Sequence, residues 1–213
     1  MKNNVTELVC ILDRSGSMSG LESDTVGGFN AMLDKQRRQG GACLVSTVLF
    51  DSESAVLHDR VPIERVEPLT ARDYTPGGCT ALLDAVGGAI RHIGNIHKYA
   101  RAEDVPEHTI FVITTDGLEN ASRRYGSDEV RSMIARQKER FGWEFLFLAA
   151  NIDAAETAAR LGIERGRAAN YRADNAGTQR MFRAMSEAVS AMRCCAEPPA
   201  DWAADIERDA GRE

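Results

Sequence analysis

Short apolar runs of strand length alternate with segments of helical period along this chain, and that alternation constrains its fold more than any other feature. Between the runs, apolar residues recur at helical spacing, as Val26, Phe29 and Leu33 do. Strands that alternate with helices predict an α/β fold, with a mostly parallel sheet covered by helices. The strand-length runs cover residues 5–12, 42–50, 54–61, 108–115, 143–149 and, more briefly, 167–170.

One pair of predicted strands breaks the alternation. Residues 42–50 and 54–61 are separated only by Asp51, Ser52 and Glu53, a link too short for the crossover that a parallel pair requires. A hairpin fits this link, so 54–61 is predicted to be an antiparallel strand at one edge of the sheet. The next segment, 62–78, contains three prolines and no clear period, and is predicted to be a long irregular connection.

Length and charge narrow the class of protein. A chain of 213 residues suits one domain, which we expect to cover residues 1–196. Residues 197–213 are predicted to be a weakly ordered C-terminal extension, with at most a short helix around Trp202. The formal net charge of −6 argues against nucleic acid as a partner, because such binding draws on clustered Lys and Arg.

Cysteine usage and the absence of apolar spans predict a cytoplasmic protein. No run approaches the roughly 18 to 20 apolar residues of a membrane span, and the N-terminus is a poor signal peptide, so no membrane partner is expected. The cysteines are odd in number and lack CxxC spacing, which indicates reduced thiols rather than disulfides or a zinc site. They are Cys10, Cys43, Cys79, Cys194 and Cys195.

Oxygen-bearing side chains gather at three predicted strand or helix ends. Asp13, Ser15 and Ser17 follow the first strand, Thr80 precedes the second long helix, and Asp116 follows the fourth strand. In open α/β sheets, ligands bind outside the carboxyl ends of the strands where the strand order reverses. The hairpin strands lie on one side of the first strand, and the chain then crosses to its other side. The strand order therefore reverses beside the first strand. Asp13 and Asp116 are therefore expected to face each other.

These donors suit a hard divalent cation. Two carboxylates and three hydroxyls form an all-oxygen set, which favours Mg²⁺, Mn²⁺ or Ca²⁺ over zinc or copper. If the backbone stays near extended, the side chains of the alternate residues Asp13, Ser15 and Ser17 point to the same side. Gly16 lets the loop bend closely around an ion. A cation held mainly by neutral hydroxyls and water keeps much of its charge. Such a site recognises an external Asp or Glu.

The run Asp13-Arg14-Ser15-Gly16-Ser17 resembles the DxSxS element of von Willebrand factor A domains. Thr80 and Asp116 stand where that family has its metal-site threonine and second aspartate, and the resemblance spans roughly residues 5–195. It implies a doubly wound, Rossmann-like sheet with one antiparallel edge strand and helices on both faces. It also implies a metal ion-dependent adhesion site holding Mg²⁺ or Mn²⁺, with direct hydroxyl ligands and aspartates that often act through water.

Each part of this constellation has a simpler explanation when taken alone. The Asp13 to Ser17 run fits a turn with side-chain-to-backbone hydrogen bonds, Thr80 fits a helix N-cap, and Asp116 fits a strand-to-helix turn. Their joint occurrence at three predicted ends favours the metal site. Among nearby residues, Glu119 and Asn120 are interpreted as exposed loop residues.

The leading hypothesis is a non-enzymatic, divalent-metal-dependent protein-binding module whose metal is completed by a partner's carboxylate. Similar intracellular proteins work beside AAA-type ATPases, kinases or phosphatases, so the resemblance implies a partner of that kind. The alternative is a metal-dependent hydrolase of the aspartyl-phosphatase type with Asp13 as nucleophile. That chemistry needs a second carboxylate two residues later, where this chain has Ser15. A third alternative is a purely structural domain without metal.

Overall fold

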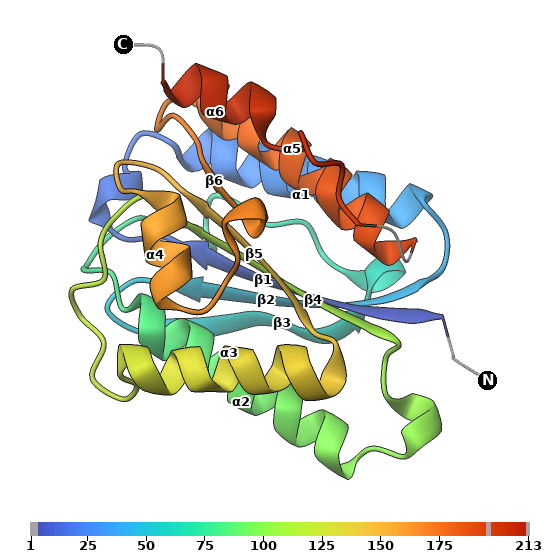
Figure 1. The fold of residues 1–213 in the computed structure, drawn as a ribbon. Helices are drawn as coiled ribbons and strands as arrows, with labels where there is room; N and C mark the ends of the chain where they lie inside the picture. The colour runs from blue at the N-terminus through green and yellow to red at the C-terminus, as the bar shows by residue number, and fades with distance from the viewer. Residues whose placement is uncertain (1–3, 195–196, 212–213) are drawn as a thin grey trace.

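A six-stranded sheet in the order β3-β2-β1-β4-β5-β6 forms the centre of the computed structural model, which describes residues 4–194 and 197–211 (Figure 1). Every neighbouring pair is parallel except β2 and β3, which are antiparallel at one edge. The predicted α/β class and the antiparallel edge strand are therefore confirmed. The strands are β1 (Val5–Asp13), β2 (Ala42–Phe50), β3 (Ser54–Pro62), β4 (His108–Thr115), β5 (Glu144–Ala149) and β6 (Ala168–Asn170).

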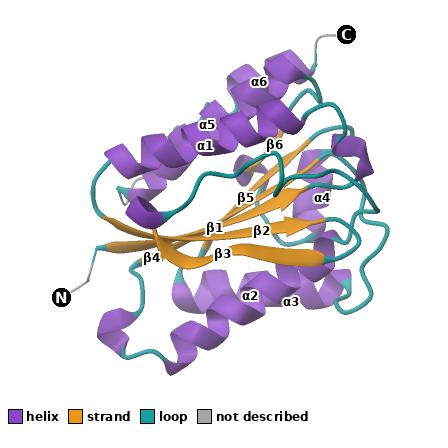
Figure 2. Ribbon diagram, turned by 180° about the vertical axis from the view of Figure 1, so that it is seen from behind, coloured by secondary structure: helices purple, strands orange, loops and turns teal. Residues whose placement is uncertain are grey.

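Helices cover both faces of this sheet, as Figure 2 shows from behind. One layer contains α1, α5 and α6, and the other contains α2, α3 and α4. No helix in the described part of the chain is long and apolar enough to cross a membrane. The helices are α1 (Glu22–Arg38), α2 (Leu82–Tyr99), α3 (Ser127–Phe141), α4 (Ala154–Arg160), α5 (Asn175–Arg193) and α6 (Ala204–Ala210).

The central strand β1 shows why the apolar runs are continuous. Leu8, Cys10 and Leu12 belong to the core beneath α1 and α5, whereas Val9 and Ile11 belong to the core beneath α2 and α3. All five side chains are fully buried. A parallel strand covered on both faces needs apolar residues at every position, because successive side chains point to opposite faces.

The strand order reverses beside β1. The chain runs from β1 through α1 to β2 on one side, and later passes through α2 to β4 on the other side. Ligands of doubly wound sheets bind at the carboxyl ends of strands where the order reverses in this way. The predicted reversal beside β1 is confirmed, and it lies where Asp13 ends the strand.

The irregular connection between β3 and α2 is well packed, although it has no regular period. Leu69 and Tyr74 are buried in the core beneath α1. The Asn30 side chain of α1 holds the connection, since its amide donates to the Leu69 carbonyl at 2.9 Å and its oxygen accepts from the Leu69 N–H at 2.8 Å. This segment carries the chain back to the end of β1.

The C-terminal extension contains a short helix. Residues 204–210 form α6, which packs against α5, and Ile206 is only 2% exposed. The short helix expected around Trp202 is present from residue 204, and Ala203 and Ile206, one helical turn apart, both enter the core. Trp202 precedes this helix, and its indole N–H donates to the Gly166 carbonyl at 3.0 Å.

Capping residues define where the later helices begin. Gly126 is the N-cap of α3, and α5 begins at Asn175 with Asp174 as its cap. Asp153 is the N-cap of α4, because its carboxylate accepts from the Glu156 N–H at 2.8 Å.

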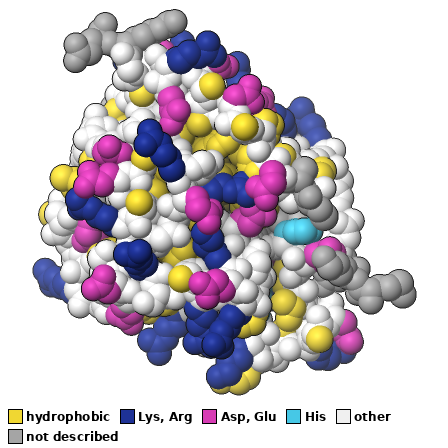
Figure 3. Space-filling view, viewed as in Figure 1, with side chains coloured by type: hydrophobic (Ala, Val, Ile, Leu, Met, Phe, Trp, Pro, Cys, Tyr) yellow, Lys and Arg dark blue, Asp and Glu magenta, His cyan; other side chains and the backbone are white. Residues whose placement is uncertain are grey.

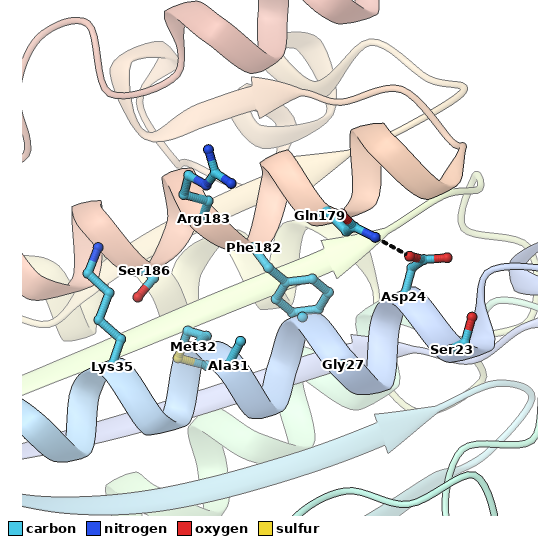
Figure 4. A pocket seen from close by; sticks show the side chains of 11 residues that line it. Ser23, Asp24, Gly27, Ala31, Met32, Lys35, Gln179, Phe182, Arg183 and Ser186 are labelled. Atoms are coloured by element: carbon cyan, nitrogen blue, oxygen red, sulfur yellow. Dashed lines mark hydrogen bonds between the residues drawn. The ribbon is translucent and has the colours of Figure 1, made fainter.

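Two adjacent glycines in α1, Gly27 and Gly28, have opposite surroundings. Figure 4 shows Gly27 of α1 and Phe182 of α5 where the two helices meet. A Cβ at Gly28 would lie 2.3 Å from Cδ2 and 2.8 Å from Cγ of Phe182, whereas a Cβ at Gly27 meets nothing within 4 Å. We expect Gly28→Ala to lower the free energy of unfolding by about 1–3 kcal/mol through overpacking. Gly27→Ala should raise it by about 0.5–1 kcal/mol, since alanine favours the helix. Urea denaturation of the pair measures both, and equal effects would contradict this packing.

Candidate metal centre

The loop after β1 turns its polar side chains toward one point. The Asp13 carboxylate accepts the backbone N–H of Ser15 at 2.7 Å through Oδ1. The hydroxyl oxygens of Ser15 and Ser17 lie 3.1 Å apart, in hydrogen-bonding contact. The turn-type hydrogen bond of the simpler explanation is therefore present, and the two serine hydroxyls converge as well.

The end of β4 joins this loop through hydroxyl groups. The hydroxyl of Thr115 donates to Oδ2 of Asp13 at 2.6 Å, and the hydroxyl of Ser17 donates to Oδ1 of Asp116 at 2.5 Å. Residues 99 and 102 positions apart in sequence are thus in direct contact. These two hydrogen bonds bring Asp13 and Asp116 to the same edge of the sheet, as the strand order predicts.

The segment before α2 closes the third side. Its backbone is tied to the first loop by two hydrogen bonds, from Gly77 N–H to the Arg14 carbonyl at 2.9 Å and from Gly16 N–H to the Gly78 carbonyl at 3.2 Å. Gly78 has a φ of 69°, which favours glycine.

Thr80 lies at the end of that segment, and its hydroxyl does not cap α2, because the N-cap of this helix is Ala81 and the first N–H groups of the helix donate to Glu119 and Ser122 instead. A Cβ at Gly117 would lie 3.4 Å from the Thr80 hydroxyl oxygen and 3.6 Å from that of Ser17. The structure therefore brings together all the predicted donors: Asp13, Ser15, Ser17, Thr80 and Asp116.

The two carboxylates are buried next to each other. Asp13 is 1% exposed and Asp116 is 2% exposed. Burial raises the pKa of Asp13, although hydrogen bonds from Thr115 and Ser15 lower it. Burial also raises the pKa of Asp116, and the negative charge of Asp13 raises it further. Arg14 does not compensate them, because its Nε pairs with Asp51 Oδ2 at 3.0 Å.

One carboxylate oxygen has no partner in this arrangement. Oδ2 of Asp116 is buried and receives no hydrogen bond from the described residues. A buried, unpaired carboxylate oxygen is costly unless a cation or donor satisfies it. Two carboxylates and three hydroxyls provide the oxygen ligands that hard divalent cations prefer. No group of three or more His, Cys, Asp or Glu that could hold a metal ion occurs within the described residues, so this donor set is rich in hydroxyls rather than in charge.

Glu119 and Asn120, which the sequence indicated only as exposed loop residues, organise the loop after β4 together with Asp84 of α2. Glu119 accepts the backbone N–H of Leu83 at 2.9 Å, in the first turn of α2, and the Asn120 side chain accepts that of Thr80 at 2.9 Å. Asp84 accepts the N–H groups of residues 123, 124 and 125. These bonds fix the position of Thr80 relative to Asp116. A carboxylate near a helix N-terminus is a recognisable signal, but its loop partners are remote in sequence.

Two buried tyrosines also support the site and were not predicted. The Tyr74 hydroxyl donates to the backbone carbonyl of Asp13, and the Tyr171 hydroxyl lies 3.5 Å from the carbonyl of Thr115. Burial is the main cause that raises the pKa of both phenols, and the nearby aspartates add to it. Both therefore remain neutral donors that position the ends of β1 and β4.

The cysteines lie apart from this donor set. Cys10 and Cys43 are buried, Cys79 and Cys194 are exposed, and none of these four forms a disulfide. Cys195 lies outside the described residues. The Cys79 N–H donates to the hydroxyl of Ser52 at 2.9 Å, beside the segment that carries Thr80.

Comparison with solved structures identifies the fold. A von Willebrand factor type A protein from Catenulispora acidiphila superposes with a TM-score of 0.57 at 14% identity, over 89% of this chain and 43% of that one. The manganese-loaded TRAP protein of Plasmodium vivax superposes with a TM-score of 0.57 at 15% identity, over 84% of this chain and 72% of that one. The proximal thread matrix protein 1 of the mussel byssus, with a zinc-occupied MIDAS motif, superposes with a TM-score of 0.58 at 13% identity, over 87% of this chain and 46% of that one.

No family model matches the sequence, and no curated protein matches it. The chain spans less than half the length of the Catenulispora and mussel proteins. At these identities the likeness shows the fold, and the chain has the α/β fold of a von Willebrand factor A domain.

Proposed function

We propose that this chain is a divalent-metal-dependent protein-binding module. The single observation that carries the proposal is the unpartnered, buried Oδ2 of Asp116 among the converging hydroxyls of Ser15, Ser17 and Thr80. The metal would be held by these hydroxyls with Asp13 and Asp116. We propose Mg²⁺ as the physiological ion, with Mn²⁺ as a close substitute, because both favour oxygen ligands.

The donor set determines what the site recognises. A bound cation supplies positive charge that attracts a carboxylate from outside. Ser17 is exposed whereas Asp13 and Asp116 are buried, so the open side of the site is lined by a neutral hydroxyl. Leu118, two residues after Asp116, is 64% exposed and gives an approaching protein an apolar contact. We therefore propose a partner protein that presents Asp or Glu.

Nothing in the geometry favours the hydrolase alternative. Ser15 occupies the position of the acid–base carboxylate, and its hydroxyl contacts Ser17. Both oxygens of Asp13 accept hydrogen bonds, from the Ser15 N–H and the Thr115 hydroxyl, which weakens it as a nucleophile. We propose a function without turnover.

Metal binding should stabilise the native protein measurably. A ligand held only by the folded state adds RT ln(1 + [L]/Kd), about 1.4 kcal/mol at ten times Kd. For a domain of this size the unfolding temperature should rise by about 3–6 °C in Mg²⁺ or Mn²⁺ relative to EDTA. Differential scanning fluorimetry measures this, with Asp13→Ala as the variant that should lose the rise. Equal unfolding temperatures in EDTA and in saturating metal would contradict the proposal.

Carboxylate recognition can be tested without knowing the partner. We expect a random peptide display selection in Mn²⁺, eluted with EDTA, to yield sequences that share an Asp or Glu. Changing that residue to Asn or Gln should abolish binding to the immobilised protein. Selected peptides that lack an acidic residue, or that remain bound in EDTA, would refute completion of the metal by a partner's carboxylate.

A further inference from the structure

A second cavity lies at the other end of the sheet from the metal centre. Its volume is about 650 Å³, and its walls come from the second halves of α2 and α3, the segment that joins α2 to β4, and the residue before β5. The eight residues of β4 run from this end to Asp116, so the two sites are about 25 Å apart. The proposed function makes no use of this cavity.

The wall nearest the sheet is apolar and rigid. Ile90 is 1% exposed and Trp143 is 4% exposed. The ring of Trp143 stacks on Phe111 with centroids 5.2 Å apart and meets the His97 ring edge-on at 5.4 Å, so its position is fixed from two sides. Phe141 also lines the cavity and is 59% exposed. A volume of this size with apolar walls suits a small molecule.

The rim carries positive charge without compensation. Arg91, Lys98 and Arg136 line the cavity, and no Asp or Glu does so among the described residues. Arg91 and Arg136 have no ion pair or hydrogen bond within the described part of the chain. In Figure 3, Lys and Arg side chains gather along the lower edge of the molecule, although the chain as a whole has a net charge of −6. The cavity is thus locally cationic on an acidic protein.

Glu7, a buried carboxylate behind the apolar wall, is already paired. Glu7 accepts from the Nε2 of His97 at 2.9 Å on the sheet side, and its carboxylate also pairs with the Nε of Arg60 at 2.8 Å. It therefore leaves the rim cations without a counterion.

From these features we propose that the cavity binds a small amphipathic anion. An apolar body, preferably aromatic, lies against Trp143 and Ile90. A single carboxylate, sulfonate or phosphate group contacts Arg91 and Arg136. Arginine forms charge-assisted hydrogen bonds with each of these oxyanions, and an apolar wall beside a cationic rim selects ligands that carry both parts.

Anilinonaphthalene sulfonate, an aromatic anion, and its uncharged analogue phenylnaphthylamine test this directly. The sequence holds two tryptophans, so the Trp202→Phe variant leaves Trp143 as the single donor for energy transfer. We expect saturable energy transfer from Trp143 to one molecule of the sulfonate. Its affinity should exceed that of the uncharged analogue by at least about tenfold.

Two substitutions locate the dye and a third controls for surface charge. A Cβ at Gly94 would lie 3.4 Å from the Gln137 side-chain nitrogen and 3.9 Å from the Trp143 ring, so Gly94→Leu fills the cavity. It should weaken both dyes about tenfold or more. Arg91→Gln combined with Arg136→Gln should weaken only the sulfonate, by about tenfold. Arg140→Gln, an exposed arginine of α3 outside the cavity, should change neither affinity.

Other outcomes would overturn the proposal. Equal affinities for the two dyes would show an apolar groove without anion preference. Energy transfer that is absent, or unchanged in the filled variant, would place the dye elsewhere. If Gly94→Leu lowers the unfolding temperature, the paired arginine variant, which alters only exposed side chains, decides the question.

Discussion

Asp116→Asn should unfold at a higher temperature than the unsubstituted protein in EDTA, and at a lower temperature than it in saturating Mn²⁺. In EDTA the substitution removes a buried charge beside Asp13 and replaces it with a neutral group of the same shape. In Mn²⁺ the same substitution removes the carboxylate whose buried oxygen has no partner in the protein and which we propose as a metal ligand. If the site binds metal as we propose, this loss should weaken metal affinity by on the order of 100-fold. The order of the two unfolding temperatures is therefore reversed by metal.

The pH dependence in EDTA follows from the same burial. The pKa values of Asp13 and Asp116 are raised in the folded state. At pH values between their unfolded and folded pKa values, the native protein therefore binds more protons than the unfolded chain. The contribution of these two groups to stability is then fully present below the unfolded pKa and is lost as pH rises through the folded pKa. The unsubstituted protein should lose stability on this rise in EDTA, and Asp116→Asn should lose less.

Scanning fluorimetry from acidic to neutral pH, with and without metal, measures both effects. Asp128→Asn is a matched control, because it makes the same change at an exposed carboxylate in the first turn of α3. It should leave the metal-dependent rise unchanged. If Asp116→Asn is less stable than the unsubstituted protein in EDTA as well as in Mn²⁺, the carboxylate is satisfied within the protein and the metal-centre interpretation fails.

Arg60→Met should lower the free energy of unfolding by about 3 kcal/mol. Glu7 on β1 is fully buried, and Arg60 contacts both of its oxygens through Nε, at 2.8 and 3.0 Å. Removing one partner of a buried ion pair leaves an uncompensated charge, which costs about 3–5 kcal/mol. The lower figure applies because the Arg60 side chain is 22% exposed and water can partly replace it. Urea denaturation at neutral pH measures the loss.

A second substitution separates charge from packing. Glu7→Gln combined with Arg60→Met should recover much of the lost stability, because the buried charge is then absent and the amide oxygen can still accept from His97. Arg160→Met removes an exposed pair with Glu156 on α4 and should cost less than about 0.5 kcal/mol. If the double variant is as unstable as the sum of its parts, packing rather than charge explains the effect.

The sequence was most informative where one physical requirement acts on every residue of a segment. Strands such as β1 and β4 are covered on both faces, so each position has to be apolar and the runs stand out. The hairpin between β2 and β3 was equally clear, because a link of three residues leaves no other connection. The candidate ligands were identified because strand ends of a parallel sheet share one edge, which relates residues as distant as Asp13 and Asp116. That they bind metal stays a prediction.

The supporting residues could not be predicted in the same way. Tyr74 lies in a segment without a period, and its hydrogen bond to the Asp13 carbonyl joins residues 61 positions apart. Glu119 and Asn120 bind backbone N–H groups 36 and 40 positions away, and no local pattern announces such partners. The order of α6 depends on burying Ala203 and Ile206 against α5, which a short polar tail does not reveal.

The way the three loops of the metal centre are joined determines when an ion can bind. Backbone hydrogen bonds between Gly77 and Arg14, and between Gly16 and Gly78, hold the loops in place using protein groups alone. The donors come from β1, the start of α2 and β4, so they meet only after the central strands have paired. We therefore expect a cation to bind only after the site is complete, and not to direct the folding of the chain. Metal should accordingly leave the refolding rate unchanged and act by slowing unfolding.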